Sequence, residues 1–300
     1  MSWIPITIFA AFAQTCRNAA QRHLVAELGT LGATLVRFLF GLPFSIAWLL
    51  AVYLAAALPM PRLGADFLAW VVVGSLAQVT GTALLLRTMA ERNFAVGVAY
   101  SKTEVLQVAL FAMLLLGETL NLHSGAAVLC GVLGVFLLAP AGGERVLQSL
   151  ASGFASRTAL LGLGCGTGMA LSSVAYGGAV RSLHSPSLLL NASVALVVAQ
   201  LVPAVLLGAW LWRRERTVLC RAFALWRQSL LAGFMGAAAS AGWMTAFALK
   251  PVTYVRTLGL IEMIFSYAVS RRLFREKLTS REIMAGALLA FGVVLITTAR

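Results

Sequence analysis

Long apolar runs separated by short charged gaps dominate this sequence and limit what it can fold into. The runs are about 17–25 residues long, the length that an α-helix needs to cross a bilayer. Only 11% of the residues are charged, whereas soluble domains carry roughly a quarter. The sequence therefore predicts an all-α polytopic membrane protein. We place ten spans, at Trp3–Ala20, Leu31–Ala57, Ala65–Leu86, Phe94–Leu116, Ser124–Ala139, Thr158–Val180, Ser187–Trp212, Leu225–Leu249, Val252–Leu273 and Arg281–Thr298.

Two parts of the chain repeat the same arrangement of glutamates. Glu104 precedes Glu118 by 14 residues, and Glu262 precedes Glu276 by 14, with an almost unbroken apolar run inside each pair. The two pairs are offset by 158 residues, close to half the chain, which indicates a duplicated unit. We expect a first five-helix repeat over residues 1–141, a connecting loop over 142–157 and a second repeat over 158–300.

Five spans in each repeat have a geometric consequence. Because the number is odd, the second copy must enter the membrane from the opposite side. The ten transmembrane helices would then form two inverted five-helix repeats. Transporters commonly have this architecture, with the substrate site near the membrane midplane between the two copies.

The basic residues predict the orientation. The loops after the odd-numbered spans hold 16 Lys and Arg, including Arg17 and Arg22, and the opposite side holds 5, including Arg256. By the positive-inside rule the odd loops are cytoplasmic, and both termini lie on the periplasmic side of a bacterial inner membrane. The net charge of +13 comes from these loops, and no basic helix stands apart as a nucleic-acid surface.

The motifs of several enzyme classes are missing from the sequence. The four cysteines and three histidines lack metal-ligand spacing, and neither a Walker A loop nor an HExxH motif occurs. We find no credible Ser-His-Asp set. We therefore expect no catalytic residues, no metal and no cofactor.

A glycine-rich stretch, Gly162–Gly168, superficially resembles a nucleotide-binding loop. It lacks the GxGxxG spacing and a preceding strand, and it lies inside an apolar span. Its overlapping GxxxG pairs, Gly162 with Gly166 and Gly164 with Gly168, predict close helix packing instead.

Polar side chains inside the spans are the candidates for a substrate pocket, because polar groups in a membrane helix face protein or water. The first span carries a polar stripe of Gln14, Arg17, Asn18 and Gln21. The alternative for Arg17 and Gln21 is that they simply mark the cytoplasmic end of the span. For single Ser or Thr residues, helix–helix hydrogen bonding is the alternative. The candidate substrate-binding residues are Gln14, Asn18, Gln78, Thr82, Tyr100, Glu104, Tyr176, Ser240 and Trp243.

The acids receive separate predictions. Glu104 shares a helix face with polar residues, so we expect it to face the substrate path and attract an amino group. Glu262 lies among apolar residues, which favours a structural role, with Lys102 or Arg37 as its partner. The alternative is that both acids pair with buried arginines and hold the two halves together. Glu118 and Glu276 follow their spans directly, and we expect them to cap or anchor helix ends.

Paired motifs in the two halves resemble the EamA-type members of the drug/metabolite transporter superfamily. Leu114-Leu115-Leu116-Gly117-Glu118 and Leu273-Phe274-Arg275-Glu276 resemble the end of the fourth span of an EamA repeat. The segments after Gly81 and Gly242 are similar to the family's third-span signature, and Arg37 matches an arginine common in the second span. The chain departs from the family in the fourth span, where Lys102-Thr103-Glu104 replaces a common proline.

The resemblance implies a ten-helix transporter of small metabolites, often an exporter of amino acids. We accordingly predict a secondary transporter that works by alternating access and exports aromatic or other apolar amino acids, as a monomer or weak homodimer. The alternatives are a carrier for another metabolite or drug class, a passive channel and a membrane-embedded lipid-modifying enzyme. An enzyme of that kind would be expected to carry clustered His, Asp or Cys at a membrane edge, and the sequence has none.

Overall fold

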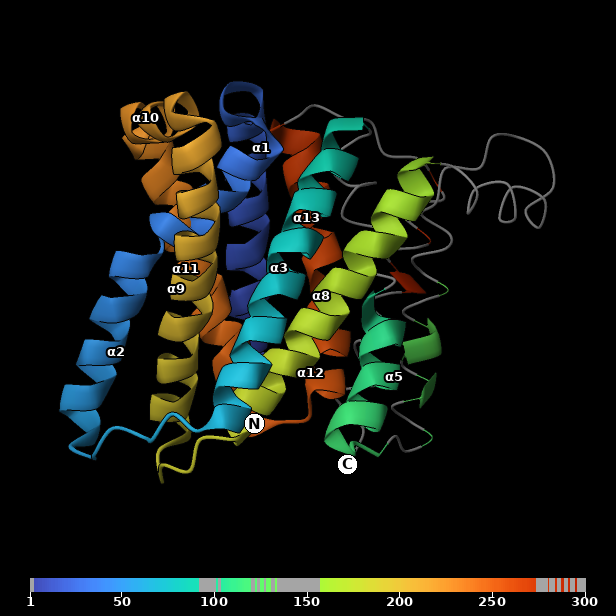
Figure 1. The fold of residues 1–300 in the computed structure, drawn as a ribbon. Coiled ribbons are helices and arrows are strands. Elements are labelled where there is room, and N and C mark those ends of the chain that lie inside the picture. Colours follow the sequence, from blue (N-terminus) through green and yellow to red (C-terminus); the bar gives the residue numbers. More distant parts are fainter. Residues whose placement is uncertain are drawn as a thin grey trace.

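The computed structural model describes residues 3–91, 101, 104–119, 122, 125, 126, 128–130, 133, 157–273, 280, 284, 287, 288, 291 and 295. Within these residues every regular element is a helix, and the long helices lie side by side (Figure 1). The elements are α1 (Trp3–Leu39), α2 (Leu42–Ala56), α3 (Ala65–Glu91), α5 (Glu104–Leu116), α8 (Arg157–Arg181), α9 (Leu188–Arg214), α10 (Arg216–Ala224), α11 (Trp226–Leu249), α12 (Val252–Leu258), η1 (Gly259–Ile261) and α13 (Glu262–Leu273).

Six helical stretches in the described part are long and apolar enough to cross a membrane. They are Trp3–Ala56, Ala65–Met89, Leu160–Arg181, Leu188–Arg214, Trp226–Leu249 and Val252–Val269. A shorter apolar helix spans Glu104–Leu116. The chain is thus an all-α, multi-pass membrane protein, as its composition predicts. The fifth and tenth expected spans lie mostly outside the described residues.

The first helix is longer than its sequence suggests. The predicted end at Ala20 is wrong, because helical structure continues through Leu28 and buries Leu24 and Leu28 one turn apart. The break comes at Gly29, whose φ of 65° lies in the region that favours glycine. The segment beyond Gly29 then begins the second predicted span, which bends again between Leu39 and Leu42.

The connection between the seventh and eighth predicted spans also contains a helix. α10 buries Leu219 and Ala222 and exposes its other face, where Arg216 and Arg221 lie. It caps one end of the bundle (Figure 1). An amphipathic helix with basic residues on its polar face is typical of the membrane interface.

Hydroxyl groups inside the long helices bond to their own backbones. Thr7 donates to the carbonyl of Trp3, Thr15 to that of Ala11, and Ser193 to that of Leu189. Each bond runs back four residues. Such bonds satisfy polar groups where no water is present.

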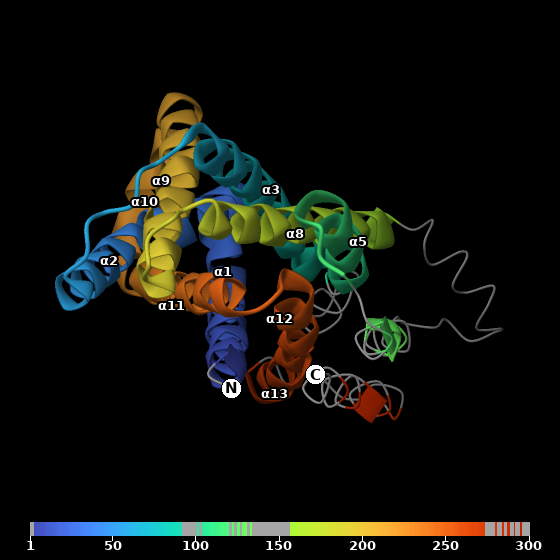
Figure 2. The ribbon, with the colours of Figure 1, turned by 90° about the horizontal axis from the view of Figure 1, so that it is seen from below.

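Two helix pairs make the most extensive contacts in the described part, α1 with α11 and α3 with α8. Figure 2 shows α3 and α8 alongside each other and α11 against α1. At the α3–α8 crossing, a Cβ added to Gly168 would lie 2.9 Å from the Cα of Gly81. At the α1–α11 crossing, a Cβ on Gly242 would lie 2.8 Å from that of Ala10. Small residues therefore set both crossings.

Candidate substrate-binding site

A small polar cavity lies among α1, α3, α8, α11 and α12. Its volume is about 30 Å³, which is room for one or two water molecules. It is too small for an amino acid, so the observed arrangement is a closed one. The lining residues are Gln14, Arg17, Arg37, Gln78, Met169, Ser173, Tyr176, Ser240, Trp243, Met244, Phe247 and Arg256.

Three arginines face this cavity, one near the middle of α1, one near its end and one in α12. Arg17, Arg37 and Arg256 are only 2%, 4% and 5% exposed. Charged side chains inside a membrane protein are costly unless they are paired or functional. The way in which each guanidinium is compensated therefore decides what this site can bind.

Arg256 is compensated by Glu104. Its Nη2 lies 2.7 Å from Oε1 of Glu104, and both side chains are buried. The guanidinium also lies over the ring of Trp243, with Cζ 4.7 Å from the ring centroid. The ion pair joins α5 to α12, and thus the two halves of the chain.

Glu262 is held by amides of α1. Nε2 of Gln14 donates to its Oε2 at 2.7 Å, and Nδ2 of Asn18 donates to its Oε1 at 3.1 Å. Arg17 in turn donates to Oδ1 of Asn18 at 2.6 Å through Nη2. Asn18 thus connects the positive charge of Arg17 to the negative charge of Glu262. The indole Nε1 of Trp243 completes the group by donating to Oε1 of Gln14 at 2.9 Å.

Arg37 is bound only by neutral groups in the described part of the chain. Its Nη1 donates to Oγ1 of Thr82 at 3.0 Å and its Nη2 to Oγ of Ser240 at 3.5 Å. Gln78 donates to the same Oγ1 of Thr82 at 3.3 Å and accepts from Ser172 at 2.9 Å. Among the described residues no carboxylate lies within 4.0 Å of the Arg37 guanidinium.

Most of the predicted binding residues meet at this cavity. Gln14, Gln78, Tyr176, Ser240 and Trp243 line it. Asn18 and Thr82 do not line it, but each accepts a hydrogen bond from an arginine that does. Arg17 donates to Asn18, and Arg37 donates to Thr82. Tyr100 lies outside the described residues, as do Lys102 and Glu276.

The described contacts of the two acids bear on their predicted roles. Glu104 does not project freely toward a substrate path, because Arg256 occupies it. Glu262 bonds to Gln14 and Asn18 of α1. Of its two expected partners, Arg37 bonds to Thr82 and Ser240 instead, and Lys102 lies outside the described residues. For Glu104 the geometry matches the alternative in which an acid pairs with a buried arginine and joins the halves.

The arginines were not among the candidate residues of the cavity predicted from the sequence. Arg17 and Arg256 were counted as loop charges and Arg37 as structural, yet all three line the cavity. Arg256 falls five residues inside its own predicted span, Val252–Leu273, and this position was the available signal. Moving Arg17 and Arg256 out of the loops changes the counts from 16 against 5 to 15 against 4, so the predicted orientation stays the same.

Glu118 lies away from the cavity, at the start of α12. Its carboxylate accepts from the backbone N–H groups of Val252 at 2.8 Å and Thr253 at 3.2 Å, and from the Thr253 hydroxyl at 3.0 Å. Arg181, at the end of α8, donates to it at 2.8 Å. This geometry is that of a helix N-terminal cap. It ties the ends of α5, α8 and α12 together.

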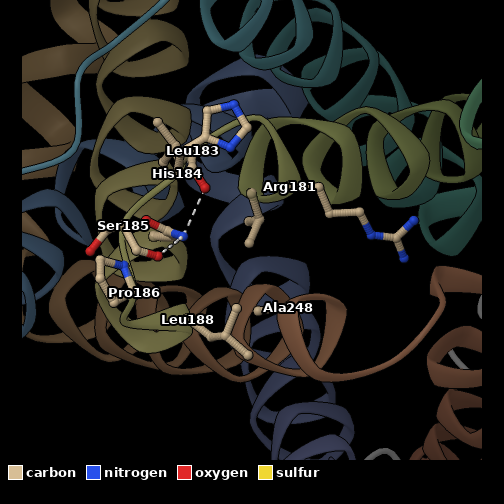
Figure 3. Close-up of a pocket in the computed structure, with 9 residues that line it drawn as sticks. Arg181, Leu183, His184, Ser185, Pro186, Leu188 and Ala248 are labelled. Carbon is tan, nitrogen blue, oxygen red and sulfur yellow. Dashed lines mark hydrogen bonds between the residues drawn. The ribbon is translucent and has the colours of Figure 1, made fainter.

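Two other hollows lie away from the buried ion pair of Arg256 and Glu104. One, of about 430 Å³, lies at the α8–α9 connection around His184 and Pro186 (Figure 3). Here Nδ2 of Asn191 bonds the carbonyls of Leu183 and Ser185, while Arg181 points away from Ser185 and Pro186. The other is an apolar groove between α1, α2, α9 and α11, with exposed Phe9, Trp48 and Phe234.

The membrane-spanning helices and the charged, water-sized cavity that they enclose define a polytopic membrane protein. Residues 1–139 match the EamA-like transporter family, which confirms the resemblance seen in the sequence. A solved crystal structure of another protein shares the fold with a TM-score of 0.67 at 19% identity, covering 99% of this chain and 96% of that one. No curated protein matches the sequence.

Proposed function

We propose that this protein is a secondary transporter that exports small metabolites, aromatic or other apolar amino acids above all, across the bacterial inner membrane. The observation that carries the proposal is the group of buried arginines and glutamates around one small cavity inside a membrane-spanning bundle. Buried charge of this kind typically marks a substrate or ion pathway.

The size of the cavity supports alternating access. At about 30 Å³ it cannot hold an amino acid. Binding therefore requires the surrounding helices to separate on one side of the membrane and then on the other. Rocking of one repeat against the other around a fixed central site is the usual way to achieve this.

The two helix crossings support an inverted repeat. Adding the 158-residue offset to Ala10 gives Gly168, and the corresponding positions Gly81 and Gly242 differ by 161 residues. Ala10 packs on Gly242, and Gly168 packs on Gly81. A pseudo-two-fold exchange of the two halves would relate one crossing to the other to within three residues. This relation favours repeats over residues 1–141 and 158–300.

The lining supports an amphipathic substrate. Beside the arginines the cavity presents Tyr176, Trp243 and Phe247 together with Met169 and Met244. Aromatic and thioether groups adapt well to apolar side chains. An amino acid with such a side chain combines the charged and the apolar groups that these residues can bind.

Efflux from reconstituted vesicles tests the proposal. Purified protein in vesicles loaded with labelled phenylalanine, tryptophan, leucine or serine should release the first three faster than protein-free vesicles do. Release of serine should be slower. If none of the four leaves faster than from protein-free vesicles, amino-acid export is wrong, and nucleotide sugars and cationic drugs become the next panel.

A further inference from the structure

Among the residues that the structure describes, the charges around the cavity do not balance. Three buried arginines, Arg17, Arg37 and Arg256, line the cavity, and two buried acids, Glu104 and Glu262, lie beside them, so the formal sum of these five is 3 − 2 = +1. Burying an uncompensated charge is expensive. A closed site with a surplus positive charge therefore favours a ligand with a negative one.

The surplus positive charge can be assigned to Arg37. Arg256 has Glu104 at 2.7 Å, and Arg17 reaches the charge of Glu262 through Asn18. Arg37 has the hydroxyls of Thr82 and Ser240, the second at a long 3.5 Å, and the ring of Phe38, all of them neutral. Its guanidinium thus has neutral partners that an incoming anion can replace. A planar guanidinium matches the two oxygens of a carboxylate.

Resting on the proposed function, we propose that Arg37 anchors the carboxylate of the substrate and that the substrate's amino group contributes little to binding. The substrate class is then apolar monocarboxylates, with or without an α-amino group. The hydroxyls of Thr82 and Ser240 serve as neutral placeholders while the site is empty.

We expect the substrate's amino group to contribute little to binding because Glu104 and Glu262 already have partners. A substrate ammonium group would compete for Glu104 with Arg256, which already pairs with it. Both oxygens of Glu262 already accept from amides, one from Gln14 and the other from Asn18. An ammonium group drawn to either acid would therefore compete with an interaction that joins α5 to α12 or α1 to α13.

Three compounds of similar shape separate these contributions. Phenylalanine carries both groups, 3-phenylpropionate only the carboxylate, and phenethylamine only the amine. Binding to the purified protein is measured by the quenching of tryptophan fluorescence and by the shift in the melting temperature. We expect 3-phenylpropionate and phenylalanine to bind with dissociation constants within about tenfold of each other, because the shared carboxylate supplies most of the charge-assisted bonding. Phenethylamine should bind at least tenfold more weakly than either. Binding of phenethylamine but not of 3-phenylpropionate overturns the inference.

Variants of Arg37 identify the anchor. In Arg37→Met the affinity for 3-phenylpropionate should fall by a factor on the order of 10–100, the value of a hydrogen bond to a charged group. The melting temperature without ligand should stay the same or rise, because the variant removes a buried charge that has no acid partner. Arg37→Lys keeps the charge and should bind with intermediate affinity, which covers the case in which the methionine variant does not fold. Arg227→Met, at an exposed arginine of α11, is the matched control and should bind normally.

Each result bears on one of two claims. If Arg37→Met or Arg37→Lys binds 3-phenylpropionate as well as the parent does, Arg37 is not the anchor. If phenylalanine is exported but 3-phenylpropionate does not bind, the inference fails and the proposed function stands. If 3-phenylpropionate binds through Arg37 but no amino acid is exported, the proposed function fails and the inference stands.

Discussion

Arg256 and Glu104 belong to different halves of the chain, yet their charged atoms lie 2.7 Å apart with both side chains buried. This pair joins α12 to α5 next to the cavity. Breaking a buried pair leaves one charge unpaired, and this costs about 3–5 kcal/mol. Removing both partners together leaves no such charge.

We therefore expect Glu104→Gln and Arg256→Met each to lower the melting temperature of the purified protein, and the double variant to recover much of the loss. Thermal unfolding in detergent, followed by tryptophan fluorescence, measures all four proteins of this double-mutant cycle. Losses that simply add in the double variant would mean that the two side chains do not interact.

Glu118 offers a second prediction, because it caps α12. Replacement by Ala removes acceptors from Val252 and Thr253 and should cost about 1–2 kcal/mol. Glu118→Gln keeps an acceptor and loses mainly the ion pair with half-exposed Arg181, so it should cost less. Equal losses in the two variants, in the same melting experiment, would contradict the capping role.

The α3–α8 crossing gives a third prediction. A Cβ at Gly168 would meet backbone atoms of Gly81, which cannot move aside as a flexible side chain can. Gly168→Ala should therefore lower the melting temperature. Gly208, inside α9, is the matched control because nothing lies within 4 Å of its added Cβ. There the change to Ala should be neutral or stabilise the helix by roughly 0.5–1 kcal/mol.

The orientation can be tested with thiol labelling in intact cells. Cys220 is exposed on α10, in the predicted cytoplasmic connection, so an impermeant maleimide should fail to reach it until the membrane is opened. In a variant with all four native cysteines replaced by Ser, a cysteine at Gly64 should react in intact cells, because this site lies in the predicted periplasmic connection. The reverse labelling pattern would invert the topology.

The sequence predicted an all-α membrane protein and the polar face of its first span for a physical reason. Apolar length and helical spacing are local properties, so the stripe that contains Gln14 and Asn18 could be recognised without knowing its neighbours. The same is true of Glu118, whose place directly after an apolar run indicated a helix end.

The pairing of charges was not accessible in the same way. Periodicity tells which face of a helix a residue occupies, but not which helix lies opposite. Glu262 is therefore found against Gln14 and Asn18 of α1, and Glu104 against Arg256 of α12. Arg37 looked structural because its partners, Thr82 and Ser240, come from two further helices.

The hydrogen bond between Gln14 and Glu262 can form only late in the synthesis of the chain. The two residues are 248 positions apart, so a ribosome adding about 5–20 residues per second needs roughly 10–50 s to deliver the second after the first. During that interval Arg17 has already been synthesised, but the carboxylate of Glu262 has not. The first helix can therefore complete its hydrogen bonds to Glu262 only when the chain is nearly finished.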